Sequence, residues 1–101
     1  GTLQWMAPEL LAGRVGHSPE IDVYAFGMLL YEVMCFEPPF ADVEPTEVRR
    51  LVLAGARPEI DADAMSELLG ELTRTCWSQE PTMRPSFSFI ADALEGVSSA
   101  T

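Results

Sequence analysis

One continuous hydrophobic run dominates the pattern of this chain. From Val23 to Tyr31 every residue is apolar or glycine. Ser18–Glu20 has the capping serine, proline and acidic residue of a helix start, and Pro38-Pro39 breaks a helix, so we predict a helix over about residues 19–36. A helix without a polar stripe is buried on every side. Because a chain of 101 residues would struggle to surround it, we expect that part of a larger protein is missing.

Shorter periodic segments predict four further helices. Each begins near a proline or a capping side chain, and several stop at glycine. We expect helices over residues 7–13, over 45–54, over 64–77 with Asp61 or Asp63 as the cap, and over 87–95 closed by Gly96, with residues 97–101 as a frayed tail. We find no segment with strand alternation that we would defend, so the predicted fold class is all-α.

The helical periodicity also predicts which side chains face the core. Apolar residues recur at intervals of three and four along each predicted helix, which places them on one face. The inward residues expected are Val48, Leu51 and Val52 in the second of these four helices, Met65, Leu68, Leu69, Leu72 and Cys76 in the third, and Phe87, Ile90, Ala91 and Leu94 in the last.

The charge balance excludes two classes of partner. The chain has 16 acidic residues against 6 basic ones, a formal net charge of −10, and all six basic residues are arginine. Binding to nucleic acid or to anionic lipid requires a clustered basic surface, so we expect neither partner. The apolar run is too short to span a bilayer, and we expect no membrane insertion in this segment.

The cysteines and the first residue bear on location and completeness. Cys35 and Cys76 lie among apolar and aromatic neighbours, which is typical of reduced, packed thiols and not of a disulfide framework. No stretch looks like a signal peptide, so we expect a cytoplasmic, intracellular protein. The chain begins with Gly1 and not methionine, which favours a processed chain or a fragment.

The sequence contains no complete catalytic or metal site. Asp61 and Asp63 offer too few oxygens for calcium and are better explained as helix caps. His17 has no second histidine or cysteine at a metal-ligand spacing. We find no nucleophile elbow, no dinucleotide-binding glycine motif and no phosphate-binding Gly-Lys loop. We therefore predict no catalytic residue and no metal ligand in this chain.

Three charged residues nevertheless stand in apolar surroundings. Asp22 directly precedes the apolar run, so its carboxylate is expected to be drawn inward and to accept hydrogen bonds. The alternative is an exposed aspartate in the first helical turn, stabilised by the helix dipole. Glu9 and Arg84 each lie beside a proline, and composition alone does not choose Arg84 over the other arginines as a partner for Glu9.

Five short motifs resemble one family in sequence order. Gly1–Glu9 resembles the end of a protein-kinase activation segment, which finishes on Ala-Pro-Glu. Asp22–Glu32 resembles the central helix of the kinase C-terminal lobe. The remaining motifs are Pro39-Phe40, Gly55-Ala56-Arg57-Pro58, and Cys76-Trp77 together with Pro81–Phe87. The resemblance covers about residues 1–96 and implies the C-terminal part of a protein-kinase domain, from the end of the activation segment onward.

The resemblance implies a role for each matching residue. Glu9 would pair with Arg84, and Asp22 would anchor the catalytic loop by accepting its backbone hydrogen bonds. Thr2 would help to orient the catalytic aspartate. Leu3, Gln4, Trp5 and Met6 would shape the pocket for the residue that follows the phosphoacceptor.

The resemblance also implies an activity for the parent protein. Gly1-Thr2 resembles the serine/threonine form, whereas Trp5–Glu9 resembles tyrosine kinases and their tyrosine-kinase-like relatives. The parent would therefore transfer the γ-phosphate of ATP, with Mg²⁺, to serine or threonine of a protein substrate, and less plausibly to tyrosine. The chain itself has no lysine, no His-Arg-Asp and no Asp-Phe-Gly, so we expect it to bind no ATP and to be inactive without the remainder of the kinase domain.

Two other functions remain open at this point. A pseudokinase lobe that binds or scaffolds partners would share these motifs, and the sequence upstream of Gly1 would distinguish it. An unrelated small helical interaction domain would have to bury its own core as a stable monomer.

Overall fold

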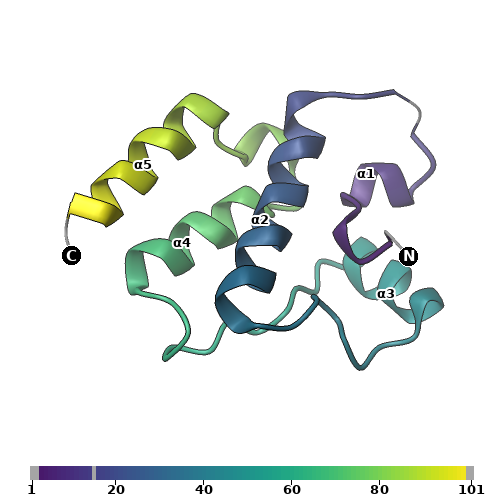
Figure 1. The fold of residues 1–101 in the computed structure, drawn as a ribbon. Coiled ribbons are helices and arrows are strands. Elements are labelled where there is room, and N and C mark those ends of the chain that lie inside the picture. The colour runs from purple at the N-terminus through teal and green to yellow at the C-terminus, as the bar shows by residue number, and fades with distance from the viewer. Residues whose placement is uncertain (1–2, 15, 100–101) are drawn as a thin grey trace.

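The computed structural model describes residues 3–14 and 16–99, and its regular elements are helices joined by loops (Figure 1). No strand occurs among these residues, which confirms the all-α prediction. The elements in chain order are the 3-10 turn η1 (Leu3–Trp5), α1 (Pro8–Leu11), α2 (Pro19–Cys35), α3 (Pro45–Leu53), α4 (Glu67–Cys76), the 3-10 turn η2 (Pro81–Met83) and α5 (Phe87–Ser99). Within the described part of the chain, no helix combines the length and the apolar character that crossing a membrane requires.

Helix α2 is the centre of the arrangement. Its start follows the sequence pattern: the Ser18 hydroxyl accepts a hydrogen bond from the Ile21 N–H at 3.4 Å, and Pro19 occupies the first turn. The helix ends at Phe36, whose φ of 59° is left-handed. Helix α4 packs along one side of α2, and α5 packs on α4 (Figure 1). The turn η1 contacts both α2 and α3, and α1 packs on α3.

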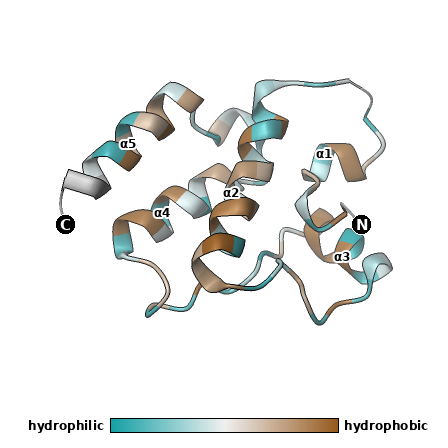
Figure 2. Ribbon diagram, viewed as in Figure 1, coloured by the Kyte–Doolittle hydropathy of each residue, from teal (hydrophilic) through white to brown (hydrophobic). Residues whose placement is uncertain are grey.

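The core forms on two sides of α2 but leaves a third side uncovered. Hydrophobic residues occupy almost the whole length of α2 (Figure 2). Val23, Tyr24 and Met28 are fully buried. In contrast, Leu29 is 48% exposed and Val33 is 58% exposed. The helix is thus apolar all round, as the pattern predicted, while the other described elements cover part of its circumference.

The contact between α2 and α4 depends on a glycine. A β-carbon placed at Gly27 would lie 2.9 Å from the Cβ atom of Cys76 and 3.3 Å from the carbonyl oxygen of Thr73. Real β-carbons do not approach other atoms so closely. Gly27 therefore allows the backbones of the two helices to come together at this point.

Helix α4 begins later than predicted. The predicted start near Ala64 with an aspartate cap is wrong, because the Ser66 hydroxyl caps the helix by accepting from the Leu69 N–H at 3.2 Å. Asp61 instead accepts from the Asp63 N–H at 2.9 Å, an Asx turn within the preceding loop. Leu68, predicted to face inward, is exposed, because the buried face of α4 is centred on Leu69, Leu72, Thr73 and Cys76.

Helix α5 extends beyond its predicted end. Gly96 does not close the helix, which continues to Ser99, so the expected boundary after residue 96 falls inside α5. Glycine costs only about 1 kcal/mol within a helix, so it does not stop one unless the chain turns there. Ile90 is buried, but Ala91 is exposed and Phe87 is only partly covered, because α5 packs mainly on α4 and buries a narrow stripe.

Candidate functional site

An ion pair joins two distant parts of the chain. Glu9 lies in the first turn of α1, and Arg84 directly follows η2. The Arg84 Nη1 atom donates to Glu9 Oε2 at 2.7 Å, and Nη2 donates to Glu9 Oε1 at 2.9 Å. The guanidinium and the carboxylate therefore meet in the parallel, two-pronged geometry that arginine alone among the basic side chains provides. The Arg84 side chain is completely buried, and that of Glu9 is 11% exposed.

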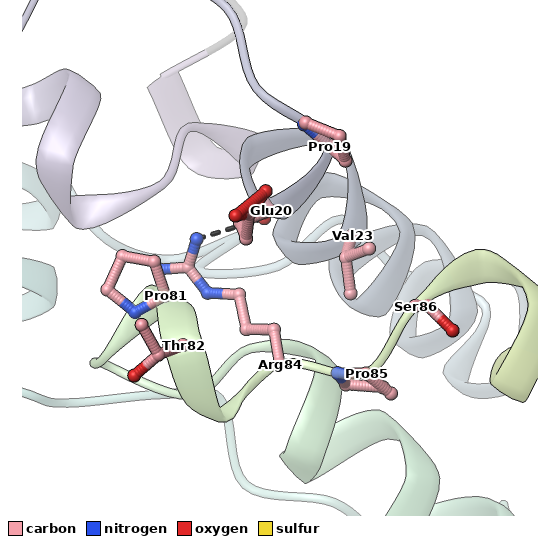
Figure 3. Close-up of a pocket in the computed structure, with 8 residues that line it drawn as sticks. All are labelled: Pro19, Glu20, Val23, Pro81, Thr82, Arg84, Pro85 and Ser86. Carbon is pink, nitrogen blue, oxygen red and sulfur yellow. Dashed lines mark hydrogen bonds between the residues drawn. The ribbon is translucent and has the colours of Figure 1, made fainter.

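The remaining donors of Arg84 bind backbone carbonyls. Nη1 also donates to the carbonyl oxygen of Glu20 at 2.9 Å, the contact drawn in Figure 3, and Nε donates to that of Ser78 at 2.9 Å. One side chain thus connects α1, the start of α2 and the loop after α4. Only one of its five N–H groups is left without a partner among the described residues.

The environment of Glu9 favours its charged form. Burial alone would raise the pKa of this carboxyl group, but the hydrogen bonds from Arg84 and from the backbone, with the positive charges of Arg84 and Arg14, outweigh that effect and lower the pKa below its ordinary value. The pair is therefore ionised at neutral pH.

Tyr24 contacts two arginines with its ring and was not foreseen as a site residue. Its ring is 5.1 Å from the guanidinium carbon of Arg57 and 5.2 Å from that of Arg84, within the range of cation–π attraction. Its hydroxyl group is buried without a hydrogen-bond partner in the described structure. Burial raises the pKa of Tyr24 to about 12. No local sequence signal identifies this stack, because its members come from three separate segments.

Arg57, the second arginine over the Tyr24 ring, binds backbone and side-chain oxygens of the neighbouring loops. Nε donates to the carbonyl oxygen of Trp77 at 2.8 Å, and Nη1 donates to that of Ala56 at 2.7 Å. Nη2 donates to the side-chain oxygen of Gln79 at 2.6 Å. The motifs around Arg57 and Trp77, which are separate in the sequence, are therefore parts of one hydrogen-bonded cluster.

The segment that the resemblance assigns to substrate binding lies against α2 and α3. Leu3, Gln4 and Trp5 form η1, and they and Met6 are partly exposed. The Trp5 indole N–H donates to the Glu32 carboxylate on α2 at 3.1 Å. Thr2, the remaining member of the expected substrate-binding set, lies outside the described residues.

Asp22 is not drawn into the interior as we expected. Its side chain is 48% exposed, and Oδ2 lies 2.9 Å from Nε2 of His17. The expectation of burial is wrong for this chain because Asp22 occupies the first turn of α2, next to the exposed loop that carries His17, where water reaches it. The acceptor role remains, with His17 as the partner. This exposed pair is separate from the Glu9–Arg84 pair.

A groove of about 300 Å³ lies beside Arg84 (Figure 3). The start of α2 forms one wall, and the segment from η2 to the start of α5 forms the other. Its lining residues are Pro19, Glu20, Val23, Pro81, Thr82, Arg84, Pro85 and Ser86. Four of the five N–H donors of Arg84 already make hydrogen bonds within the protein. The groove therefore does not present a free guanidinium to an anion.

Within the described ranges, no three His, Cys, Asp or Glu side chains are gathered in a way that could hold a metal ion. The sequence also lacks the lysine that contacts the phosphates in protein kinases. The arrangement is instead one that fastens a partly exposed segment, residues 3–6, to a helical framework.

The sequence of this chain is similar to sequences of known proteins. The family model described as protein tyrosine and serine/threonine kinase matches residues 1–94. A probable LIM domain-containing serine/threonine-protein kinase of Dictyostelium discoideum is 40% identical over 97% of the chain and 15% of its own length. The serine/threonine-protein kinase VIK of Arabidopsis thaliana is 38% identical over 96% of the chain and 22% of its own length.

A third relative is named as a tyrosine kinase. The seven transmembrane domain-containing tyrosine-protein kinase 1 of Dictyostelium discoideum is 39% identical over 94% of the chain and 14% of its own length. The chain thus spans less than a quarter of each of these three relatives. The family match extends from the Ala-Pro-Glu segment through the Arg84 loop into α5, and the chain belongs to the protein tyrosine and serine/threonine kinase family.

Proposed function

We propose that this chain forms the helical, substrate-facing part of a protein-kinase catalytic domain, and that the full-length protein phosphorylates serine or threonine residues of other proteins. The observation that carries this proposal is the buried two-pronged pair between Glu9 and Arg84. It fastens the segment that ends on Ala-Pro-Glu to the loop before α5.

The Glu9–Arg84 pair supports the proposed kinase function because it restrains residues 3–6, which precede Glu9. Glu9 follows residues 3–6 by only a few positions, so the end of that segment cannot move far while Glu9 is held. Protein phosphorylation depends largely on positioning the acceptor hydroxyl group. Residues 3–6 would form the wall that receives the substrate residue following the acceptor, and Thr2 would help to orient the catalytic aspartate.

Asp22 fits a role as the anchor of the catalytic loop. It is half exposed, and His17 is the one side chain of the described part that hydrogen-bonds to its carboxylate. Backbone N–H groups of another segment of the protein could therefore reach it. The ATP site and the catalytic aspartate would be supplied by that other sequence, because this sequence has no lysine, no His-Arg-Asp and no Asp-Phe-Gly.

Serine or threonine is the preferred acceptor in this proposal. Gly1-Thr2 resembles the serine/threonine form, and two of the three relatives described above are named as serine/threonine kinases. A requirement for ATP, together with the free thiols of Cys35 and Cys76, suits the reducing cytoplasm. The partners would be protein substrates and the remainder of the kinase domain.

Phosphorylation of peptide libraries by the full-length protein tests this function. Three libraries that differ only in having serine, threonine or tyrosine as the acceptor would be incubated with ATP and Mg²⁺. We expect incorporation of phosphate into the serine or threonine libraries. Incorporation mainly into the tyrosine library would refute the specificity, and no incorporation into any library would refute the enzymatic function in favour of a binding role.

A further inference from the structure

A hollow with an apolar floor lies where α2 ends. The loop between α3 and α4 passes this end of the helix (Figure 1), and together they line a space of about 300 Å³. Tyr31, Met34 and Cys35 contribute the last turns of α2, Phe36 directly follows the helix, and Ala64 belongs to the loop. Because Phe36 is 93% exposed, the hollow offers an aromatic surface to a ligand.

Four carboxylates surround this floor. They come from two separate segments of the sequence and belong to Glu37, Glu59, Asp61 and Asp63. Among the described residues, none of the four forms an ion pair, and no arginine lines the hollow. Like charges gathered in this way repel one another and create a negative potential that attracts cations. We call this feature the acidic hollow.

Two of the carboxylates are held in place by short contacts. Glu37 Oε1 accepts a hydrogen bond from the Tyr31 hydroxyl at 3.1 Å, and Asp61 Oδ1 accepts from the Asp63 N–H at 2.9 Å. Both also act on the thiol of Cys35. Burial raises the pKa of this thiol, a backbone contact with Asp61 lowers it in part, and the negative charges of Glu37 and Asp61 raise it further. Charges from both segments therefore act on the same hollow.

The chemistry of the acidic hollow fits arginine side chains. No three His, Cys, Asp or Glu side chains of the described residues are arranged to hold a metal ion, so the carboxylates suit a larger ligand with several separate cations. A guanidinium group binds a carboxylate through two parallel hydrogen bonds and stacks on aromatic rings. Its methylene stem packs on apolar surface, which the floor of the hollow supplies.

The acidic hollow is separate from the apolar stripe of α2. Successive residues of a helix are rotated by about 100°, so the helix face that carries Tyr31 and Cys35 is opposite the face that carries the exposed Leu29 and Val33. A segment that covered the stripe would therefore pack on the other side of the helix.

We propose that the acidic hollow is a docking surface for a segment of another protein in which arginines alternate with apolar residues. The arginines pair with the carboxylates, and an apolar side chain between them packs on Met34 and Ala64. This inference goes beyond the kinase function proposed above, because the binding requires neither ATP nor phosphate transfer.

Fluorescence anisotropy of a labelled peptide with the full-length protein, without ATP, tests the proposal. The probe is the fluorescein-labelled peptide Gly-Arg-Leu-Arg-Leu-Arg-Gly. A matched peptide has citrulline in place of each arginine, which nearly keeps the shape of the side chain but removes its charge. Spermine, which has amines but no apolar side chain, and the unlabelled arginine peptide are the competitors.

The variants separate the acidic hollow from the overall charge of the protein. The triple variant combines Glu59→Gln, Asp61→Asn and Asp63→Asn, and the Asp61→Asn change keeps an oxygen for the Asx turn. Glu37→Gln, which keeps an acceptor for Tyr31, alters the other segment. The control changes net charge as much as the triple variant does, at exposed residues of α4 and α5: Glu71→Gln, Asp92→Asn and Glu95→Gln.

The arginine peptide should bind the triple variant about tenfold more weakly than the wild type, because three exposed charge contacts are lost. Glu37→Gln should weaken binding about threefold, since one contact is lost. The control variant should bind as the wild type does. The citrulline peptide should bind the wild type at least about tenfold more weakly, and spermine should displace the probe less readily than the unlabelled peptide does.

Four results would overturn the proposal. The wild type does not bind the arginine peptide, or it binds the citrulline peptide equally well. The triple variant and the control lose the same affinity, which would mean that net charge alone attracts the peptide. Spermine displaces the probe as readily as the unlabelled peptide does, which would assign the hollow to small polyamines. Since no step needs ATP, a wild type that transfers no phosphate leaves all of these expectations unchanged.

Discussion

A single guanidinium, that of Arg84, connects parts of the chain that lie up to 75 residues apart. It binds the Glu9 carboxylate and the carbonyl oxygens of Glu20 and Ser78, and it stacks on the Tyr24 ring. Because its side chain is completely buried, these interactions cannot be replaced by water. At the scale of the residue, the fixed position of the Ala-Pro-Glu segment depends on this group.

Removal of one partner of the buried pair should be strongly destabilising. In Arg84→Lys the ammonium group cannot make the two-pronged contact, so Glu9 is left buried and poorly paired, at a cost of about 3–5 kcal/mol. Native-state hydrogen exchange of the α1 and α2 amides in the full-length protein measures this local free energy of opening. The control is Arg50→Lys, whose partner Glu47 lies on the exposed surface of α3, and for which we expect no measurable change. Equal effects of the two substitutions would contradict the role of burial.

The pair also predicts a pH dependence. Because the folded structure lowers the pKa of Glu9 below 4.5, its contribution to stability is complete above about pH 4.5 and is lost as the pH falls through the lowered value. The stability advantage of the wild type over Glu9→Gln should therefore shrink in acid. Far-UV circular dichroism during acid titration of both proteins measures this, and a constant difference down to pH 3 would argue against an ionised pair.

At the scale of the elements, the close contact of α2 with α4 is the most constrained feature. It passes through Gly27, where no side chain fits between the helices. Gly96, in the exposed last part of α5, has open space around it. The two glycines therefore predict opposite effects of the same substitution.

Gly27→Ala should destabilise the protein by about 1–3 kcal/mol, because the new methyl group would press on Cys76 and separate the helices. Gly96→Ala should be neutral or stabilise α5 by up to about 1 kcal/mol, since alanine favours helix and nothing is displaced. Hydrogen exchange of the α4 and α5 amides reports both effects. Similar stability of Gly27→Ala and the wild type would show that the helices can move apart at little cost.

The elements that the sequence predicted well are those with an unambiguous local signal. Helix α2 starts at its Ser18 cap, and α3 ends just before Gly55, as their patterns indicate. The start of α4 could not be predicted, because Asp61, Asp63 and Ser66 are all good caps and tertiary packing decides among them. The contact of Tyr24 with Arg57 and Arg84 could not be predicted either, since it depends on contacts between distant segments.

At the scale of the whole molecule, an uncovered apolar surface remains on α2. Leu29, Val33 and Phe36 are exposed, the last to 93%. Leu29 and Val33 are four residues apart in α2 and so lie on one face, an apolar stripe, and Phe36 directly follows the helix. In the proposed function, this stripe is a surface that the remainder of the kinase domain would cover.

The isolated chain should therefore associate with itself. Exposed apolar stripes of this kind drive association, and a net charge of −10 opposes it without covering the surface. Sedimentation equilibrium should show a mass that rises with concentration, and Leu29→Gln with Val33→Thr should reduce it. Leu68→Gln, a change at an exposed leucine of α4, is the control and should have little effect. A monomer at all concentrations, with cooperative unfolding, would favour an independent helical domain.

Phosphate transfer by the full-length protein, with Arg84 intact or altered, shows whether this chain is a working part of a kinase catalytic domain. The wild type and Arg50→Lys should transfer the γ-phosphate of ATP to a serine or threonine peptide at the same rate. Arg84→Lys, kept folded as judged by circular dichroism, should be slower by about tenfold or more, because the substrate-facing segment is no longer held. A wild type without transfer, or an Arg84→Lys variant as fast as the wild type, would contradict the account.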